Sequence, residues 1–233
     1  MNQRPTVLRS TLLPAQLLGE VGLGDRVGTP DPVYQLGDAG QPAPYPTLLI
    51  AVSDDSGSVT GSGGNDPVAA RYREMERAFV SVTRAGVARE FGAVIHFDVG
   101  SDADVAPVRL IGRGLRRLRR GLRTPQSAAG SSELGPSLRR AAALANAYQD
   151  HETTLVVLSD FELLDPDPTA TLSDLANFPG QVHAVVLGAQ PRIALFDDRI
   201  AVTTVRPEDP PGAVARVLFS SLVAHRPGSR ASL

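Results

Sequence analysis

Oxygen-bearing side chains follow an apolar run early in the chain, at a spacing that suits a small, hard cation. Residues 48–52 are continuously apolar, and Asp54, Ser56 and Ser58 come shortly after them. In this Asp-x-Ser-x-Ser spacing, a loop that curls around one point aims all three side chains at it. Such oxygen ligands are the ones that Mg²⁺ prefers. The stretch is therefore a candidate cation site.

A second aspartate stands in a matching position later in the chain. Residues 154–159 form another apolar run, and Asp160 follows it directly. Runs of this kind are typical of strands that are buried on both faces of a parallel sheet. Such sheets bind ligands outside the carboxyl ends of their strands, where the strand order reverses. If the two strands are neighbours across that reversal, Asp54 and Asp160 face the same crevice.

Strand patterns alternate with helical patterns along the rest of the chain. This alternation predicts an α/β fold, a Rossmann-like three-layer αβα arrangement around a mostly parallel sheet. We expect further strands at 91–97, 105–111, 182–187 and 200–205, of which 105–111 is short and polar enough to lie at an edge. We expect helices at 66–86, 114–123, 136–148, 173–177 and from 211 onward.

The length fits one sizeable domain with a short arm, since the chain has 233 residues. We expect an N-terminal arm over residues 1–45, a domain over 46–226 and a tail over 227–233. The Gly- and Pro-rich stretch 21–46 should form an irregular connection. We find no signal-peptide pattern and no apolar run that approaches a membrane span, so we expect a cytoplasmic protein that makes no membrane contact.

Composition excludes several classes of function. The chain has no cysteine, which excludes disulfides, thiolate metal sites and thiol catalysis. All 23 of its basic residues are arginine, so any mechanism that requires a lysine is excluded. The net charge of -2 argues against a general nucleic-acid binder.

Three segments together resemble a known family. They are residues 54–58 (Asp-Asp-Ser-Gly-Ser), 130–136 (Gly-Ser-Ser-Glu-Leu-Gly-Pro) at a helix start, and 155–160 (Leu-Val-Val-Leu-Ser-Asp). In this order they resemble the von Willebrand factor type A (vWA) domain. The metal-ion-dependent adhesion site (MIDAS) of that family combines Asp-x-Ser-x-Ser with a threonine in a Gly-rich turn and an aspartate after the fourth strand. The resemblance spans about residues 45–225.

This resemblance implies a metal site and a function. The implied ligands of a Mg²⁺ or Mn²⁺ ion are Asp54, Ser56, Ser58, Ser132 and Asp160. An open coordination position would accept an Asp or Glu side chain of a protein partner, which makes the protein an adaptor rather than an enzyme. Intracellular bacterial members of the family often act beside AAA-type ATPases, and we expect a partner of that kind.

The chain departs from the family pattern in two places. Ser132 takes the threonine position and lacks the methyl group that restricts a threonine side chain. Phe161 stands where the family usually has glycine, at the rim of the site. Among the other acidic residues nearby, we expect Asp55 to face solvent or to cap the loop, and Asp165 and Asp167 to shape a turn.

The helix expected at 114–123 places arginines on its outer face. We interpret this face either as a solvated surface or as a surface for an acidic partner, for which Arg116, Arg117, Arg120 and the rim residue Phe161 are candidates. No aromatic residues are interleaved to stack bases, so we do not expect nucleic acid. The four histidines have no ligand spacing and are expected to be structural or exposed.

Two other interpretations of the acidic cluster remain open. Mg²⁺ among carboxylates also activates water, so a Mg²⁺-dependent hydrolase or nuclease is one alternative. A degenerate vWA scaffold that keeps the fold without holding a metal is the other. A receiver domain would need a lysine at a later strand end, and a nucleotide-binding P-loop is absent from the sequence, so both of these are excluded.

Overall fold

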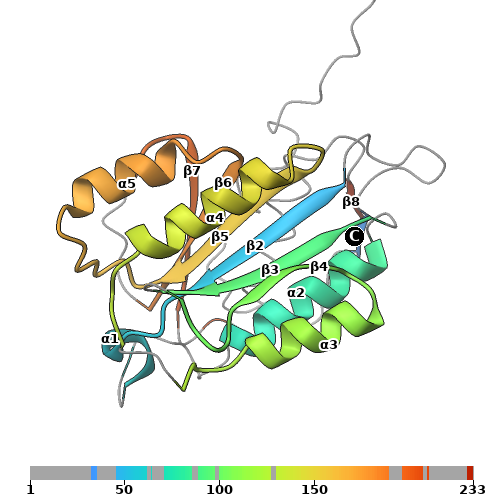
Figure 1. Cartoon of the computed structure of the whole chain (residues 1–233), viewed down its shortest axis with the longest axis horizontal. Coiled ribbons are helices and arrows are strands. Elements are labelled where there is room, and N and C mark those ends of the chain that lie inside the picture. The colour runs from blue at the N-terminus through green and yellow to red at the C-terminus, as the bar shows by residue number, and fades with distance from the viewer. Residues whose placement is uncertain are drawn as a thin grey trace, which may run out of the picture.

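A six-stranded sheet forms the centre of the protein (Figure 1). The structure is a computed structural model that describes residues 33–35, 46–61, 64, 71–85, 89–97, 100–126, 130–188, 196–206, 209 and 230–232. In spatial order the strands are β4 (Val105–Arg109), β3 (Phe91–His96), β2 (Thr47–Ser53), β5 (Glu152–Ser159), β6 (Gln181–Leu187) and β7 (Ile200–Val205). All neighbours pair in parallel except β3 and β4. The predicted mostly parallel sheet, with an edge strand at β4, is confirmed.

Helices cover both faces of this sheet, which confirms the three-layer αβα arrangement. On one face lie α2 (Arg71–Ala85) and α3 (Gly112–Gly121), and on the other lie α4 (Gly135–Ala147) and α5 (Pro168–Ala176) (Figure 1). Each helix packs an apolar stripe on the sheet, because apolar residues three and four apart share one side of a helix. Phe79 and Leu118 contribute to the first layer, and Leu138 and Leu175 to the second.

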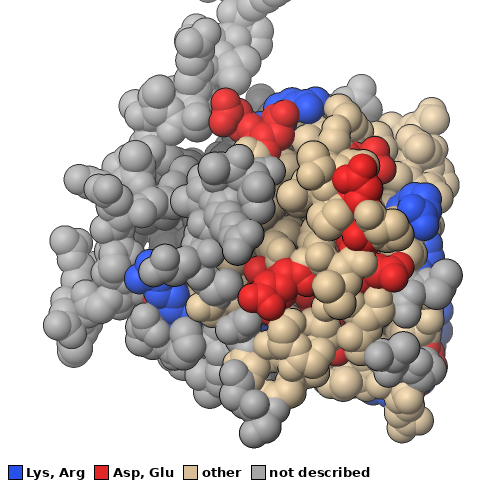
Figure 2. All heavy atoms as spheres, turned by 90° about the vertical axis from the view of Figure 1, so that its left-hand side faces the viewer, with Lys and Arg blue, Asp and Glu red and all other residues tan. Residues whose placement is uncertain are grey.

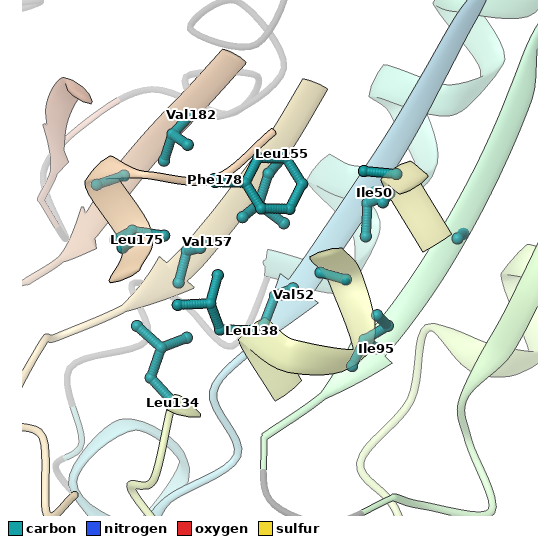
Figure 3. Close-up of a cluster of buried hydrophobic side chains, with 14 of the residues drawn as sticks. Ile50, Val52, Ile95, Leu134, Leu138, Leu155, Val157, Leu175, Phe178 and Val182 are labelled. Carbon is teal, nitrogen blue, oxygen red and sulfur yellow. The ribbon is translucent and has the colours of Figure 1, made fainter. Parts of the chain in front are cut away.

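The strand β2 shows why both faces need covering. Its seven residues are all buried, and successive side chains of a strand point to opposite faces. Leu49 and Ala51 therefore join the core under α2 and α3, whereas Ile50 and Val52 join the core under α4 and α5. Figure 3 shows the second core, with Leu138 close to the strand residues. The side chains of the residues that follow β2 continue to alternate between the two faces of the sheet.

The structure differs from the sequence predictions in two short segments. The predicted loop after β2 contains one helical turn, α1 (Gly57–Thr60), in which Val59 is buried. Within the predicted irregular stretch 21–46, β1 (Val33–Gln35) pairs with β8 (Arg230–Ser232). Three predictions lie outside the described residues: most of the N-terminal arm, the helix start at 66–67 and the closing helix from 211.

The described helices are too short or too polar to cross a lipid bilayer.

Candidate metal centre

The predicted aspartates lie at the ends of neighbouring strands. The strands β2 and β5 pair in parallel, with Ser53 opposite Leu158, so Asp54 and Asp160 both leave the sheet at its carboxyl edge. The Asp54 backbone N–H also donates to the Leu158 carbonyl at 2.9 Å. Chain order reverses between these two strands, because β3 lies beyond β2 and β6 lies beyond β5. The expected crevice of a parallel sheet is therefore where the sequence places the carboxylates.

The first segment curls as the Asp-x-Ser-x-Ser spacing predicts. The Ser56 backbone N–H donates to Asp54 Oδ1 at 2.8 Å, and the hydroxyl oxygens of Ser56 and Ser58 lie 3.0 Å apart. The helical turn α1 then holds this curl, since the Thr60 N–H and hydroxyl both donate to the Ser56 carbonyl. Three oxygen-bearing side chains are thus gathered into one short loop.

Ser132 is positioned by the loop that follows Asp160. The Leu164 N–H donates to the Ser132 carbonyl at 3.1 Å, which joins the two loops. Asp165 then accepts bonds from the N–H groups of Leu134 and Gly135 at 2.9 and 2.7 Å. These N–H groups belong to the start of α4, where helix donors lack partners within the helix. Asp165, which we expected to shape a turn, therefore also caps α4 beside Ser132.

Another acidic residue of that loop, Asp167, acts on the next helix. Asp167 accepts a hydrogen bond from the Ala170 N–H at 3.0 Å and caps the start of α5. Glu162 donates its backbone N–H to Asp160 Oδ1 at 3.1 Å. The loop after β5 is therefore fixed at several points, and Asp160 is held within it.

Asp54 is a fully buried carboxylate whose contacts within the described part of the chain are neutral. Ser159 donates its hydroxyl to Asp54 Oδ2 at 2.5 Å, opposite the Ser56 contact. Burial raises the pKa of Asp54, the bonds from Ser159 and Ser56 offset part of that rise, and the charge of Asp160 raises it further. A divalent cation bound here would compensate both negative charges.

Asp55 lies elsewhere than the sequence predicts. It is 6% exposed and does not face solvent. Its carboxylate pairs with Arg71 at 2.7 Å and with His96 Nδ1 at 2.5 Å, and it also accepts a hydrogen bond from the Tyr72 hydroxyl. The reason is strand alternation, because Asp55 falls on the opposite face from Asp54 and meets α2 there. We call these four residues the Asp55 cluster.

His96 connects the Asp55 cluster to α3. Its Nε2 lies 2.9 Å from the Gly121 carbonyl, and its other ring nitrogen, Nδ1, faces the Asp55 carboxylate. Burial raises the pKa of Asp55, but the bond and charge of His96, with smaller effects from Tyr72 and Arg71, outweigh it and lower that pKa. His96 is therefore structural, as expected.

The oxygen donors fit a hard divalent cation. Two carboxylates and three hydroxyls are the ligand types that Mg²⁺ and Mn²⁺ take, and hydroxyls add no charge. Within the described residues, clusters of three or more His, Cys, Asp or Glu side chains that could hold a metal are absent. The ligand roles of Asp54, Ser56, Ser58, Ser132 and Asp160 remain predictions.

Solved structures of other proteins share this fold. A von Willebrand factor type A protein from Catenulispora acidiphila matches with a TM-score of 0.52 and 15% identity, over 77% of this chain and 42% of its own. The pilus adhesin SpaC from Lactobacillus rhamnosus GG matches with a TM-score of 0.58 and 14% identity, over 85% and 33%. This chain has the vWA fold. Because the identities are low, the likeness shows the fold alone.

A third structure with the vWA fold carries a metal. Proximal thread matrix protein 1 from the mussel byssus, with a zinc-occupied MIDAS motif, matches with a TM-score of 0.53 and 14% identity, over 78% of this chain and 49% of its own. This chain thus spans less than half of the length of each of the three proteins. No protein-family model and no curated protein matches the sequence.

Phe161 adopts the backbone conformation that glycine favours. Its φ is +58°, the left-handed region that bulky residues rarely enter. Its ring packs edge-on against Phe196 with centroids 5.0 Å apart. This packing accounts for a phenylalanine at a position where the vWA pattern usually has glycine. Phe161 directly follows Asp160 in the chain, and its place at the rim of the site remains a prediction.

The other predicted partner-binding residues lie on α3. Arg116, Arg117 and Arg120 are exposed there, whereas Leu118 is buried against the sheet. The predicted division between outer arginines and inner leucines is therefore confirmed. Their role in binding a partner remains a prediction.

Proposed function

We propose that this protein is a protein-binding module that holds Mg²⁺ or Mn²⁺ at the carboxyl edge of its sheet and receives a partner's carboxylate there. The observation that carries the proposal is the environment of Asp54. It is fully buried and its pKa is raised by burial and by Asp160, yet the described residues give it hydroxyl and amide contacts and no ion pair. A cation from outside the chain would supply the missing charge.

The neutral ligands explain why such a cation would bind a partner. Ser56, Ser58 and Ser132 contribute oxygens without contributing charge, so a bound Mg²⁺ stays electrophilic and accepts a further anionic ligand. Figure 2 shows that acidic side chains gather on the face where the carboxyl ends of the strands lie. A free anion would be repelled by this face unless a cation were present. The proposed partner contact therefore depends on the metal.

Calorimetric titration with Mg²⁺ and Mn²⁺ tests the metal step. Wild type should bind one ion, and Asp54→Ala should bind none. Asp174→Ala is the matched control, because Asp174 is an exposed carboxylate on α5, and it should bind like wild type. If Asp54→Ala bound the ion with unchanged affinity, the proposed site would be wrong.

A pull-down from native lysate tests the partner step. A partner retained by wild type with Mg²⁺, and lost both with chelator and in Asp54→Ala, would support the metal-bridged contact. Equal retention in all three conditions would eliminate it. A cytoplasmic location and association with an AAA-type ATPase are further predictions, which the identity of the retained partner would address.

The same purified protein tests for enzymatic activity. Incubation with Mg²⁺ or Mn²⁺ and single- or double-stranded nucleic acid should give no cleavage. Metal-dependent cutting that disappears in Asp160→Ala would overturn the proposal in favour of a nuclease, because Mg²⁺ among carboxylates also activates water.

A further inference from the structure

A cleft of about 430 Å³ lies between α3 and the turn that precedes β4. Residues 102–105 line one side of it, and the carboxyl end of α3 lines the other. Its charged lining consists of four arginines and two aspartates, namely Arg117, Arg119, Arg120, Arg123, Asp102 and Asp104. We call it the arginine cleft. Positive side chains outnumber negative ones, in a protein whose net charge is -2.

Part of this charge is already paired. Arg123 lies 2.6 Å from Asp102 Oδ2, and Arg119 pairs with Glu76 on α2 at 2.5 Å. Asp104 accepts the His96 backbone N–H at 2.8 Å and lies 3.5 Å from Arg140. Both aspartates of the arginine cleft are therefore engaged by groups other than Arg117 and Arg120.

Arg117 and Arg120 are the cations that remain. Both are exposed, and neither forms an ion pair with any residue that the structure describes. They stand three positions apart, so their side chains lie on the same side of α3. Arg113 and Arg116 stand four positions before them on the same side, and α3 contains no acidic residue. Like charges at these spacings destabilise a helix, so helix stability does not account for them.

The wall that carries these two arginines is held in place. Gly121 packs so closely on this part of the chain that a Cβ atom there would lie 2.3 Å from Val105 Cγ2, at the start of β4, and 2.7 Å from the Ala103 carbonyl oxygen in the turn before it. The Gly121 carbonyl also accepts the hydrogen bond from His96 Nε2 at 2.9 Å. A fixed wall lowers the entropy cost of binding a ligand. The arginine cleft is therefore a preformed concavity with two guanidinium groups that form no ion pair with a described residue.

We propose that the arginine cleft binds the carboxylate side chains of an acidic peptide segment in a protein partner. Guanidinium groups match carboxylates with two parallel hydrogen bonds, and Arg117 and Arg120 have this capacity available. Among the described residues, the lining contains no aromatic side chain on which bases could stack. A short acidic segment fits better.

Fluorescence anisotropy with the full-length protein tests this proposal. The probe is a labelled peptide of alternating glutamate and glycine, and the matched glutamine–glycine peptide is its control. In chelator, wild type should bind the glutamate peptide and not the glutamine peptide. Arg117→Gln with Arg120→Gln should weaken binding at least about tenfold, because two charge-assisted contacts are lost.

The matched protein variant is Arg73→Gln with Arg113→Gln. It removes the same charge from two exposed helix positions, but these residues do not line the arginine cleft, so binding should weaken less than about twofold. Equal weakening by both double variants would mean that only the general surface charge acts, and would overturn the proposal. No binding of the glutamate peptide by wild type would also overturn it.

Two further arms complete the test. A single-stranded oligonucleotide of equal charge that bound more tightly than the glutamate peptide would overturn the choice of an acidic peptide. Asp54→Ala should bind the glutamate peptide as wild type does in chelator, because the arginine cleft needs no metal. Loss of binding in that variant would overturn the arginine cleft, whereas failure of metal binding alone would overturn only the metal-bridged function.

Discussion

Asp54 and Asp55 are adjacent in the chain, yet the two sides of the sheet give them opposite electrostatic environments. Asp54 faces hydroxyl groups and a second aspartate, and its pKa is raised, chiefly by burial. Asp55 is buried as well, but the Asp55 cluster surrounds it with Arg71, Tyr72 and the His96 ring, and its pKa is lowered. Burial alone therefore does not decide how a carboxylate behaves; the charges brought to it do.

The difference separates two roles. The Asp55 cluster satisfies its carboxylate from within the chain and ties the loop after β2 to α2 and β3, and through the Gly121 carbonyl to α3. Asp54 is left with charge that the described residues do not compensate. The Asp55 cluster holds this loop in place on one side, and on the other side the Asp54 carboxylate has no counter-charge among the described residues. Such a loop is suited to hold an ion from solution.

The largest effect is expected from Asp55→Ala. It leaves Arg71 and His96 buried without their carboxylate, and breaking a buried ion pair costs about 3–5 kcal/mol of unfolding free energy. Urea denaturation measures this loss. Asp150→Ala is the matched control, because Asp150 also pairs with a histidine, His151, but is 75% exposed, and it should be nearly neutral. Equal midpoints for Asp55→Ala and wild type would contradict the assigned role.

The next largest effect is expected from binding of a metal ion at Asp54. At about one hundred times the dissociation constant, a bound ion should stabilise wild type by about 2.7 kcal/mol. Asp54→Asn should gain nothing from Mg²⁺, since it removes a ligand charge. Without metal, the variant should be at least as stable as wild type, because the fold disfavours the charged form of Asp54. Thermal melting with and without chelator measures both, and an equal metal-induced rise in Tm for the two proteins would refute the assignment.

The two aspartates should also give opposite pH dependence in metal-free protein. Both start from an ordinary pKa of 3.8. Between pH 3.8 and the raised pKa, the unfolded chain has released the Asp54 proton and the folded chain still holds it. Through this range the free energy of unfolding of wild type therefore falls, relative to that of Asp54→Asn, as pH increases. As pH falls through the lowered pKa of Asp55, the free energy of unfolding of wild type decreases relative to that of Asp55→Asn.

Urea titrations across the acid range measure these two difference curves. Each slope is bounded by about 1.4 kcal/mol per pH unit for one proton. The curves should run in opposite directions, one falling with increasing pH and the other rising. Two slopes of the same sign would show that the environments of the two residues are alike, which would contradict the difference described above.

The smallest effect is expected at the rim. Phe161→Gly removes the strain of φ +58°, worth about 1–3 kcal/mol, and it also removes the ring contact with Phe196 and its burial, worth a similar amount. The free energy of unfolding should therefore change by less than about 1.5 kcal/mol, and metal affinity should stay the same. A large loss of metal affinity would show that Phe161 belongs to the site rather than to its rim.

Much of the carboxyl edge of the sheet can be predicted from the sequence, because the position of its strands depends on the periodicity of apolar residues. Continuous apolar runs predict β2 and β5, and the residues that follow them must emerge at the carboxyl edge. The Asp55 cluster was not predicted, although a signal for it exists. Strand alternation carried past Ser53 places Asp54 and Asp55 on opposite faces, and Arg71 and Tyr72 open the helix that covers the second face.

Other features depend on side-chain contacts that no local pattern reveals. Arg71 and Glu74 lie among the polar positions of an amphipathic helix, yet both are buried. Asp165 reaches the start of α4 across 31 residues of sequence. His96 carries no ligand spacing, and its role depends on Gly121 from another element. Long-range hydrogen bonds of this kind require the assembled fold.

Anomalous diffraction from crystals grown with Mn²⁺ tests the metal site most directly. One manganese peak is expected within coordination distance of Asp54 and Asp160, together with the hydroxyls of Ser56, Ser58 and Ser132. A peak elsewhere, or no peak between the two aspartates at saturating Mn²⁺, would contradict the proposed function.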